Sequence, residues 1–184
     1  EHRMRDRKTS VRNSLICGLL AIATFIGIGL AASAQEIPGS AEIDFAGFMD
    51  LGDEVFELRE DRLLTLQAFN DMAETPNTII LDARSRYAFE EGHIEGAVNL
   101  PFSDFTDEKL ADVIPSKDTR ILIYCNNNFS DDAEPIPLKR VSLALNIPTF
   151  INLYGYGYEN IYELGDRVMM DLPDVHWVTG SSPL

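Results

Sequence analysis

Two short apolar runs constrain the fold of this 184-residue chain more than any other feature. Residues 78–81 read Thr-Ile-Ile-Leu and end at Asp82, and residues 120–124 read Arg-Ile-Leu-Ile-Tyr and lead directly into Cys125. Continuous β-rich runs without polar alternation are typical of strands covered on both faces, as in parallel sheets with helices on either side. The runs therefore predict an α/β fold with an open, mainly parallel sheet flanked by helices on both faces.

The segments around these runs follow a strand-helix-strand pattern that starts at Arg62. Thr65 and Ser85 are suitable N-caps, Gly92 can end a helix, and Pro148 should break or kink one. The predicted strands are residues 63–64, 97–100 and 160–164, and the predicted helices are 54–59, 66–73, 86–91, 104–113 and 138–145, followed by a further segment at 149–156.

The first 34 residues differ in composition from the rest of the chain. Five basic residues precede an uncharged apolar run at 15–32, and Ala32, Ser33 and Ala34 fit a cleavage site that would leave Gln35 as the mature N-terminus. The alternative is an uncleaved membrane anchor, because 18 apolar residues approach the length that spans a bilayer. We expect residues 1–34 to be a signal peptide, 35–61 a linker, 62–170 one domain and 171–184 a tail.

The charge of the chain limits its partners. The formal net charge is −15, and because residues 1–34 hold five basic and two acidic residues, residues 35–184 carry −18. Such a surface repels nucleic acid, so no nucleic-acid partner is expected, and a membrane is a partner only if the N-terminal segment stays uncleaved. After cleavage Cys125 would be the one remaining cysteine, which excludes an intrachain disulfide.

Cys125 is the candidate nucleophile. In open α/β sheets ligands bind beyond the carboxyl ends of the strands, where both Asp82 and Cys125 are predicted to lie. Backbone N–H groups and a following helix N-terminus would favour a thiolate that can attack a substrate or hold an outer sulfur as a persulfide. Strand position alone leaves open the alternative of a buried, inert cysteine.

Three sequence stretches narrow this choice. Residues 80–84 (Ile-Leu-Asp-Ala-Arg) and 87–101 (Tyr-Ala-Phe-Glu-Glu-Gly-His-Ile-Glu-Gly-Ala-Val-Asn-Leu-Pro) resemble the V-D-x-R and F-x-x-G-H-I-x-G-A-x-N-x-P signature of the rhodanese family. Residues 157–164 are similar to its G-[FY]-x-N-V-Y-x-L strand. The resemblance implies a rhodanese-like fold in which Cys125 ends a strand and opens an active-site loop of residues 125–130.

The resemblance also implies a function. Cys125 would accept a sulfane sulfur and pass it to a thiol or another thiophilic acceptor, and Arg86 matches the family's anion-binding arginine, with a solvated surface charge as the alternative. Asp82 and the loop residues would border the substrate, and these loop residues are Asn126, Asn127, Asn128, Phe129 and Ser130.

His93 is expected to satisfy backbone hydrogen bonds rather than to catalyse. His93 and His176 form no metal-site pattern with Cys125, and no cofactor is implied.

The site departs from the family pattern in its charge and length. Active family loops often carry Arg or Lys, whereas this loop has three asparagines followed by Asp131 and Asp132, so thiosulfate should be a poor donor and the carboxylates should disfavour a thiolate. An insert of roughly fifteen residues by alignment follows, in which Lys139 and Arg140 either fold back to the site or form a charged first helical turn. Asp131 stands where dual-specificity phosphatases carry an arginine, which argues against phosphatase action.

These observations predict an exported single-domain sulfurtransferase that uses a Cys125 persulfide, with a small sulfur donor and a thiol acceptor, or a partner protein, as its partners. Two alternatives remain open at this point. The domain is a catalytically silent binding module in one, and Cys125 is a redox-sensing thiol in the other.

Overall fold

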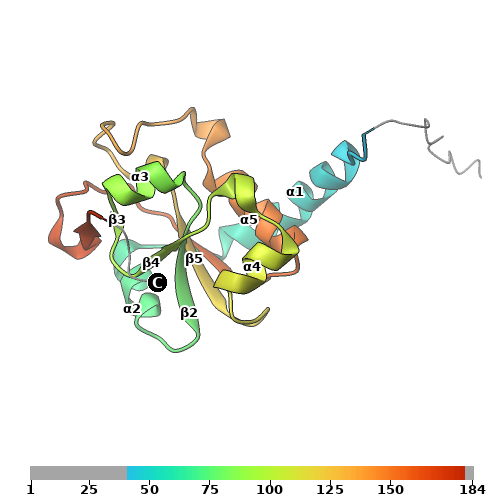
Figure 1. Cartoon of the computed structure of the whole chain (residues 1–184), viewed down its shortest axis with the longest axis horizontal. Coiled ribbons are helices and arrows are strands. Elements are labelled where there is room, and N and C mark those ends of the chain that lie inside the picture. Colours follow the sequence, from blue (N-terminus) through green and yellow to red (C-terminus); the bar gives the residue numbers. More distant parts are fainter. Residues whose placement is uncertain (1–40, 181–184) are drawn as a thin grey trace, which may run out of the picture. The chain divides into compact units, whose positions relative to one another are not determined.

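The computed structural model describes residues 41–180. Five parallel strands form the central sheet in the order β1 (Leu63–Leu64), β6 (Ile161–Leu164), β5 (Arg120–Tyr124), β2 (Thr78–Asp82) and β4 (Ala97–Asn99) (Figure 1). The two apolar runs of the sequence are thus the adjacent strands β2 and β5, with Asp82 opposite Tyr124. The predicted parallel sheet is confirmed.

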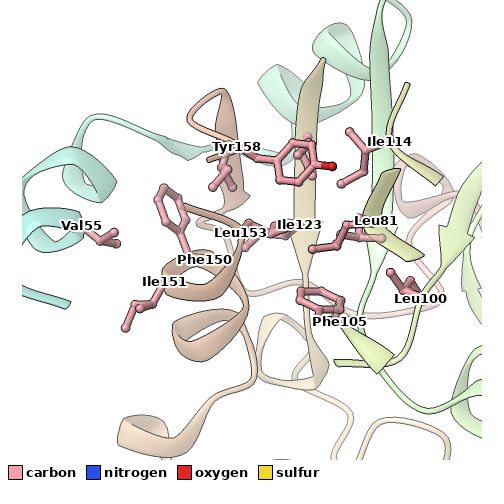
Figure 2. Packing of buried hydrophobic residues seen from close by; sticks show 14 residues of the cluster. Val55, Leu81, Leu100, Phe105, Ile114, Ile123, Phe150, Ile151, Leu153 and Tyr158 are labelled. Carbon is pink, nitrogen blue, oxygen red and sulfur yellow. The ribbon is translucent and has the colours of Figure 1, made fainter. Parts of the chain in front are cut away.

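Helices cover both faces of the sheet, and each face has its own hydrophobic cluster. α1 (Phe45–Glu60), α4 (Asp107–Val113) and α5 (Asn146–Gly155) cover one face, whereas α2 (Leu66–Ala73) and α3 (Arg86–Glu91) cover the other (Figure 1). On the first face, Leu153 of α5 points towards Ile123 of β5, and the ring of Phe150 lies on the side of α5 where Val55 of α1 is found (Figure 2). Burying each such side chain contributes about 1.5–3 kcal/mol, so α1 is held by the same core as the strands.

Side-chain caps determine where two of the helices begin. Thr65 Oγ1 accepts a hydrogen bond from the Ala68 N–H at 3.2 Å, and Ser85 Oγ accepts one from the Ala88 N–H at the same distance. Each bond satisfies one of the N–H groups that a helix leaves unpaired in its first turn. Both predicted caps and the predicted bounds of α2 and α3 are confirmed.

Two of the predicted helices, and the start of the predicted segment at 149–156, differ from the structure. The helix expected at 104–113 starts at Asp107, after the 3-10 turn η1 (Phe102–Asp104), because the Thr106 side chain caps it. The helix expected at 138–145 is wrong, since that segment contains only the 3-10 turn η3 (Val141–Leu143). α5 begins instead at Asn146 and contains Pro148, which costs no hydrogen bond in a first turn where the N–H would be unpaired anyway.

The segment at 35–61 was expected to be a linker or N-terminal extension with a short helix at 54–59, and the helix is present but starts nine residues earlier. α1 runs from Phe45 to Glu60 and is capped by Asp44, whose Oδ1 accepts from the Gly47 N–H at 2.8 Å. Acidic residues and scattered aromatics give this segment no clear apolar periodicity, so its full length as a helix was not predicted. Val55 is its buried residue. This helix is therefore a structural part of the domain.

The segment expected to be a C-terminal tail also belongs to the fold. β7 (Trp177–Val178) pairs antiparallel with β3 (His93–Ile94), after the 3-10 turn η4 (Pro173–Val175). The Trp177 indole lies edge-on to Phe129 with ring centroids 5.0 Å apart. The late tryptophan thus covers the chain that follows Cys125.

The predicted signal peptide at 1–34 lies outside the described residues. Over residues 41–180, no helix combines the length and the apolar character needed to cross a bilayer.

Candidate functional site

Cys125 lies at the carboxyl end of β5, at the border of a cavity of about 640 Å³. Only 2% of its surface is exposed. The cavity is bounded by α1, by the start of α5 and by the end of β6, which contribute Val55, Asn146 and Glu163 among other residues. A thiol therefore stands at the place where ligands bind in open α/β folds.

Asparagine side chains hold the backbone that follows Cys125. Asn128 Oδ1 accepts from the Cys125 N–H at 2.9 Å, and its Nδ2 donates to the Leu164 carbonyl at 2.6 Å. Asn127 Nδ2 donates to the Lys139 carbonyl at 2.8 Å, while its Oδ1 accepts from the Lys139 N–H at 3.0 Å. The Asn127 side-chain amide bonds both the N–H and the carbonyl of Lys139, as a neighbouring strand would. The side chains of Asn127 and Asn128 therefore fix the backbone conformation of the loop.

The predicted loop residues divide into two groups. Asn127 and Asn128 line the cavity together with Cys125. The other three point elsewhere: Asn126 donates to the Pro137 carbonyl at 3.0 Å, Phe129 is fully buried, and the Ser130 N–H donates to the Val168 carbonyl at 2.8 Å. The structure thus brings together two of the five loop residues that were predicted to border the substrate.

The insert folds back to the loop through Asn127, and the charged first helical turn considered from the sequence is not formed. Lys139 lines the cavity as a result, whereas Arg140 is exposed and does not line it. α5 starts after the insert, and the Asn146 side chain reaches Asn128 Oδ1 at 3.3 Å. The N-terminus of a helix therefore still reaches the cysteine loop, although it comes about twenty residues later in the chain than Cys125.

Burial raises the pKa of the Cys125 thiol above its ordinary value. The backbone N–H groups of Asn146, Asn127 and Leu145 act in the opposite direction and lower it, while the negative charge of Glu163 raises it further. Both opposing influences expected from the sequence, N–H groups that lower the pKa and a carboxylate that raises it, are present, but the burial that raises it most was not expected. Desolvation outweighs the N–H groups because only the charged form loses its hydration on burial.

An ion pair next to Cys125 was not found from the sequence. Arg59 of α1 donates to Glu163 of β6 through Nε at 2.6 Å and through Nη2 at 2.7 Å. Both residues line the cavity, and Glu163 is only 5% exposed. Hydrogen bonding to Glu163 raises the pKa of Arg59, so the guanidinium keeps its positive charge. The only sequence signal for this ion pair was Glu163 itself, because a glutamate inside an otherwise buried strand usually needs a partner.

Asp82 lies at the end of the neighbouring strand but belongs to a different network. Its carboxylate accepts from Arg84 Nη2 at 2.6 Å and from the Tyr124 hydroxyl at 2.5 Å. Side chains alternate along a strand, so Tyr124 and Cys125 point to opposite faces of the sheet. Asp82 does not line the cavity of Cys125, and the structure does not bring the two predicted site residues together.

The predicted anion-binding arginine is also distant from the cavity. Arg86 is the exposed first residue of α3 and borders a separate hollow with Arg84 and Phe102. Of the arginines in the described chain, Arg59 and Arg167 line the cavity instead.

His93 behaves as predicted. Its Nδ1 lies 2.8 Å from the Phe89 carbonyl oxygen, and its ring stacks on Phe89 with centroids 3.7 Å apart. It does not line the cavity of Cys125. Between residues 41 and 180, no group of three His, Cys, Asp or Glu side chains is arranged to hold a metal ion.

The carboxylates of the insert are used by the backbone. Asp131 Oδ2 accepts from the Met170 N–H at 3.1 Å, and Asp132 Oδ1 accepts from the Leu138 N–H at 2.9 Å. The carboxylate that raises the pKa of Cys125 is Glu163. A carboxylate does raise the pKa of the thiol, as expected, but it is Glu163 and not Asp131 or Asp132.

Curated relatives match the chain over part of their length. A tRNA uridine(34) hydroxylase of Photorhabdus laumondii is 30% identical over 79 residues, which are 41% of this chain and 22% of the relative. A protein of the same name from Legionella pneumophila is 23% identical over 115 residues, covering 61% of this chain and 39% of the relative. The chain thus spans less than half the length of these relatives.

Solved structures with a similar fold include a thiosulfate sulfurtransferase from Pseudomonas aeruginosa, with 18% identity, a TM-score of 0.44 and coverage of 67% of this chain and 21% of the other. A rhodanese from E. coli has 20% identity, a TM-score of 0.37 and coverage of 56% and 99%. The profile of the rhodanese-like domain matches residues 65–164, which is more than half of the chain and runs from the cap of α2 to the end of β6. The chain therefore belongs to the rhodanese-like domain family.

Proposed function

We propose that this domain is a sulfurtransferase that carries a sulfane sulfur as a persulfide on Cys125. The observation that carries this proposal is the position of Cys125 beside the cavity, with the backbone N–H groups of Asn127, Leu145 and Asn146 acting on its sulfur. Such groups stabilise negative charge at a fixed point, whether on a thiolate or on the outer sulfur of a persulfide.

The raised pKa of Cys125 gives the resting enzyme a protonated thiol at neutral pH. Attack on a donor then requires loss of the proton as the new bond forms. The N–H groups of Asn127 and Asn146 favour that step because they interact more strongly with the charged sulfur than with the thiol. A protonated resting thiol also protects the site from oxidation in an oxidising compartment.

Intact-mass measurement tests the proposal. The purified protein is incubated with sulfane-sulfur donors of different size and charge, and its mass is recorded before and after mild reduction. We expect the mass of one added sulfur, removed by reduction and absent from a Cys125→Ser control. Unmodified protein after treatment with every donor would overturn the proposal.

We further propose that the domain works outside the cytoplasm. The support is the order of a basic segment, an apolar run and Ala32-Ser33-Ala34 in the sequence. N-terminal sequencing of the protein from its host should give Gln35. Recovery only in membranes, with residues 1–34 intact, would establish the anchor alternative.

A binding module is the second candidate, favoured by one observation. Cys125 is almost fully buried and the loop after it has no cationic side chain, a combination that suits recognition better than anion turnover. In that case Cys125→Ser would leave partner binding and cell phenotype unchanged. The redox-sensor alternative is the weakest, because sensor thiols are exposed and have a low pKa.

The activity named for the curated relatives is not proposed for this chain. Transfer RNA is a polyanion, and a chain with a net charge of −15 repels it at long range.

A further inference from the structure

We infer that the donor for Cys125 is an organic sulfane-sulfur compound with an apolar body and at most one negative charge, rather than a small inorganic anion such as thiosulfate. This inference rests on the proposed persulfide function and adds the substrate class.

The walls of the cavity are the first argument. Apolar side chains from α1, the insert and α5 surround the approach to Cys125, and they include Val55, Phe56, Leu138, Val141, Ile147 and Ile151. The volume of about 640 Å³ lies within the range of pockets that enclose organic ligands. A thiosulfate ion would leave most of this apolar surface in contact with water, whereas an alkyl or aryl group would cover it.

The exposure of these walls is the second argument. Phe56 is 68% exposed, Val141 85% and Ile147 37%. These three side chains line the same cavity although they come from different elements. Large apolar side chains that converge on one cavity without being covered indicate a binding surface for an apolar group.

The charges next to the sulfur are the third argument. Arg59 is engaged by Glu163 through two hydrogen bonds, so its charge is already paired with a carboxylate. Lys139 and Arg167 line the cavity and form no ion pair within residues 41–180. Neither is among the groups that shift the pKa of Cys125, which are backbone N–H groups and Glu163. Directly at the sulfur a dianion would therefore meet an ion pair that is already internally compensated and offers it no net attraction.

The transfer step is balanced without an outside oxidant or reductant. With a thiosulfonate as donor, Cys125–SH and R–SO₂–S⁻ give Cys125–S–SH and R–SO₂⁻. The S–S bond forms at Sγ, the donor bond between the sulfane sulfur and the sulfonyl sulfur breaks, and the thiol proton ends on the persulfide. The sulfinate leaves with the bonding electron pair.

Gly52 offers a way to fill the cavity without disturbing the fold. It lies within α1 and lines the cavity, and a Cβ placed there would contact only Ile151 Cδ1, at an ordinary 3.8 Å. Alanine and leucine are both better helix formers than glycine. Gly52→Leu should therefore occupy part of the cavity, while Gly52→Ala is the matched control for the change in helix propensity.

The experiment compares second-order rate constants for persulfide formation, read by intact mass, with thiosulfate, methanethiosulfonate and benzenethiosulfonate. The two thiosulfonates have the same charge, and the change of their ratio between the Gly52 variants separates the effect of the cavity from the intrinsic reactivity of the donors. We expect benzenethiosulfonate to react on the order of ten-fold faster than methanethiosulfonate, as burial of a few carbon atoms predicts, and thiosulfate to be slowest. Gly52→Leu should remove most of that preference for the phenyl donor, whereas Gly52→Ala should retain it.

The outcomes separate the inference from the proposed function. If no donor produces a persulfide, the proposed function falls and the inference falls with it. If thiosulfate and benzenethiosulfonate react equally fast, the persulfide function stands and the inference is overturned. The inference is also overturned if Gly52→Leu slows both donors by the same factor while its thermal unfolding matches that of Gly52→Ala.

Discussion

Glu163 is a buried residue next to the candidate nucleophile, and its negative charge adds to burial in raising the pKa of Cys125. Replacing Glu163 by Gln removes that charge and leaves Arg59 without its ionic partner. The pKa of Cys125 should therefore fall, and loading from thiosulfate should become faster. The rate of iodoacetamide alkylation against pH measures the pKa, with exposed Glu159→Gln as the control. A profile that superimposes on that of the control would show that the Glu163 charge does not reach the sulfur.

A second prediction concerns Asp82, which the sequence placed at the site and the structure places in a buried network. Asp82→Asn leaves the Arg84 guanidinium, only 3% exposed, without its carboxylate. Breaking a buried ion pair from one side costs about 3–5 kcal/mol. The free energy of unfolding from urea titration should fall by that amount. Asp104→Asn is the control, since its exposed pair with Lys109 should contribute nothing measurable. A loss no greater than that of the control would contradict the assigned role.

At the scale of elements, the short pair of β3 and β7 closes the fold beside the strand that leads to Cys125. Gly92 permits this pairing because the Trp177 indole packs against it where a side chain would stand. A Cβ built on Gly92 would lie 2.7 Å from Cε2 of Trp177. Its φ of 165° is extended backbone that any residue adopts, so the requirement for glycine comes from the indole.

Gly92→Ala should therefore destabilise the protein by about 1–3 kcal/mol, the usual cost of overpacking. In a Trp177→Leu background the same substitution should cost less, because the ring that it meets is gone. A double-mutant cycle measured by thermal unfolding gives the coupling between the two positions. Equal costs in the two backgrounds would show that Trp177 is not the obstacle.

α1 is the element that most changes the interpretation of the site. It supplies Gly52, Val55, Phe56 and Arg59 to the cavity, yet the sequence predicted only its last part, at 54–59, as a helix. Because its buried residue Val55 packs with residues of α5, the helix borders the cavity of Cys125 and positions the charge of Arg59 near the sulfur. The burial that raises the pKa of the thiol depends on an element that precedes the family-like region.

For the whole molecule, the buried Cys125 and Tyr124 make stability dependent on pH in the alkaline range. Both have a pKa that is raised by burial, so the folded protein keeps protons that the unfolded chain loses, starting near pH 8.5 for the thiol. Their contribution is fully present at neutral pH and is lost as the pH rises through the folded-state pKa values. The urea midpoint should fall between pH 8 and 10, and it should fall less in Cys125→Ser. An equal fall in both proteins would assign the effect to other groups.

The local elements could be predicted because their signals lie within a few residues. The apolar runs of β2 and β5, the caps Thr65 and Ser85 and the helix α2 all match their predicted places. The position of Cys125 at a strand end followed from β5 alone. The start of α5 was missed because Pro148 is equally compatible with breaking a helix and with the first turn of one.

Sequence by itself determined the parallel α/β sheet, the family and the identity of the cysteine, since apolar periodicity, capping and motif spacing are properties of neighbouring residues. Only the tertiary structure decided what surrounds that cysteine. Arg59 and Glu163 are 104 residues apart in the chain, and α1 covers the cavity by packing on α5. Contacts of this kind depend on which faces the whole core buries together, and the same core sets the desolvation that keeps the thiol protonated.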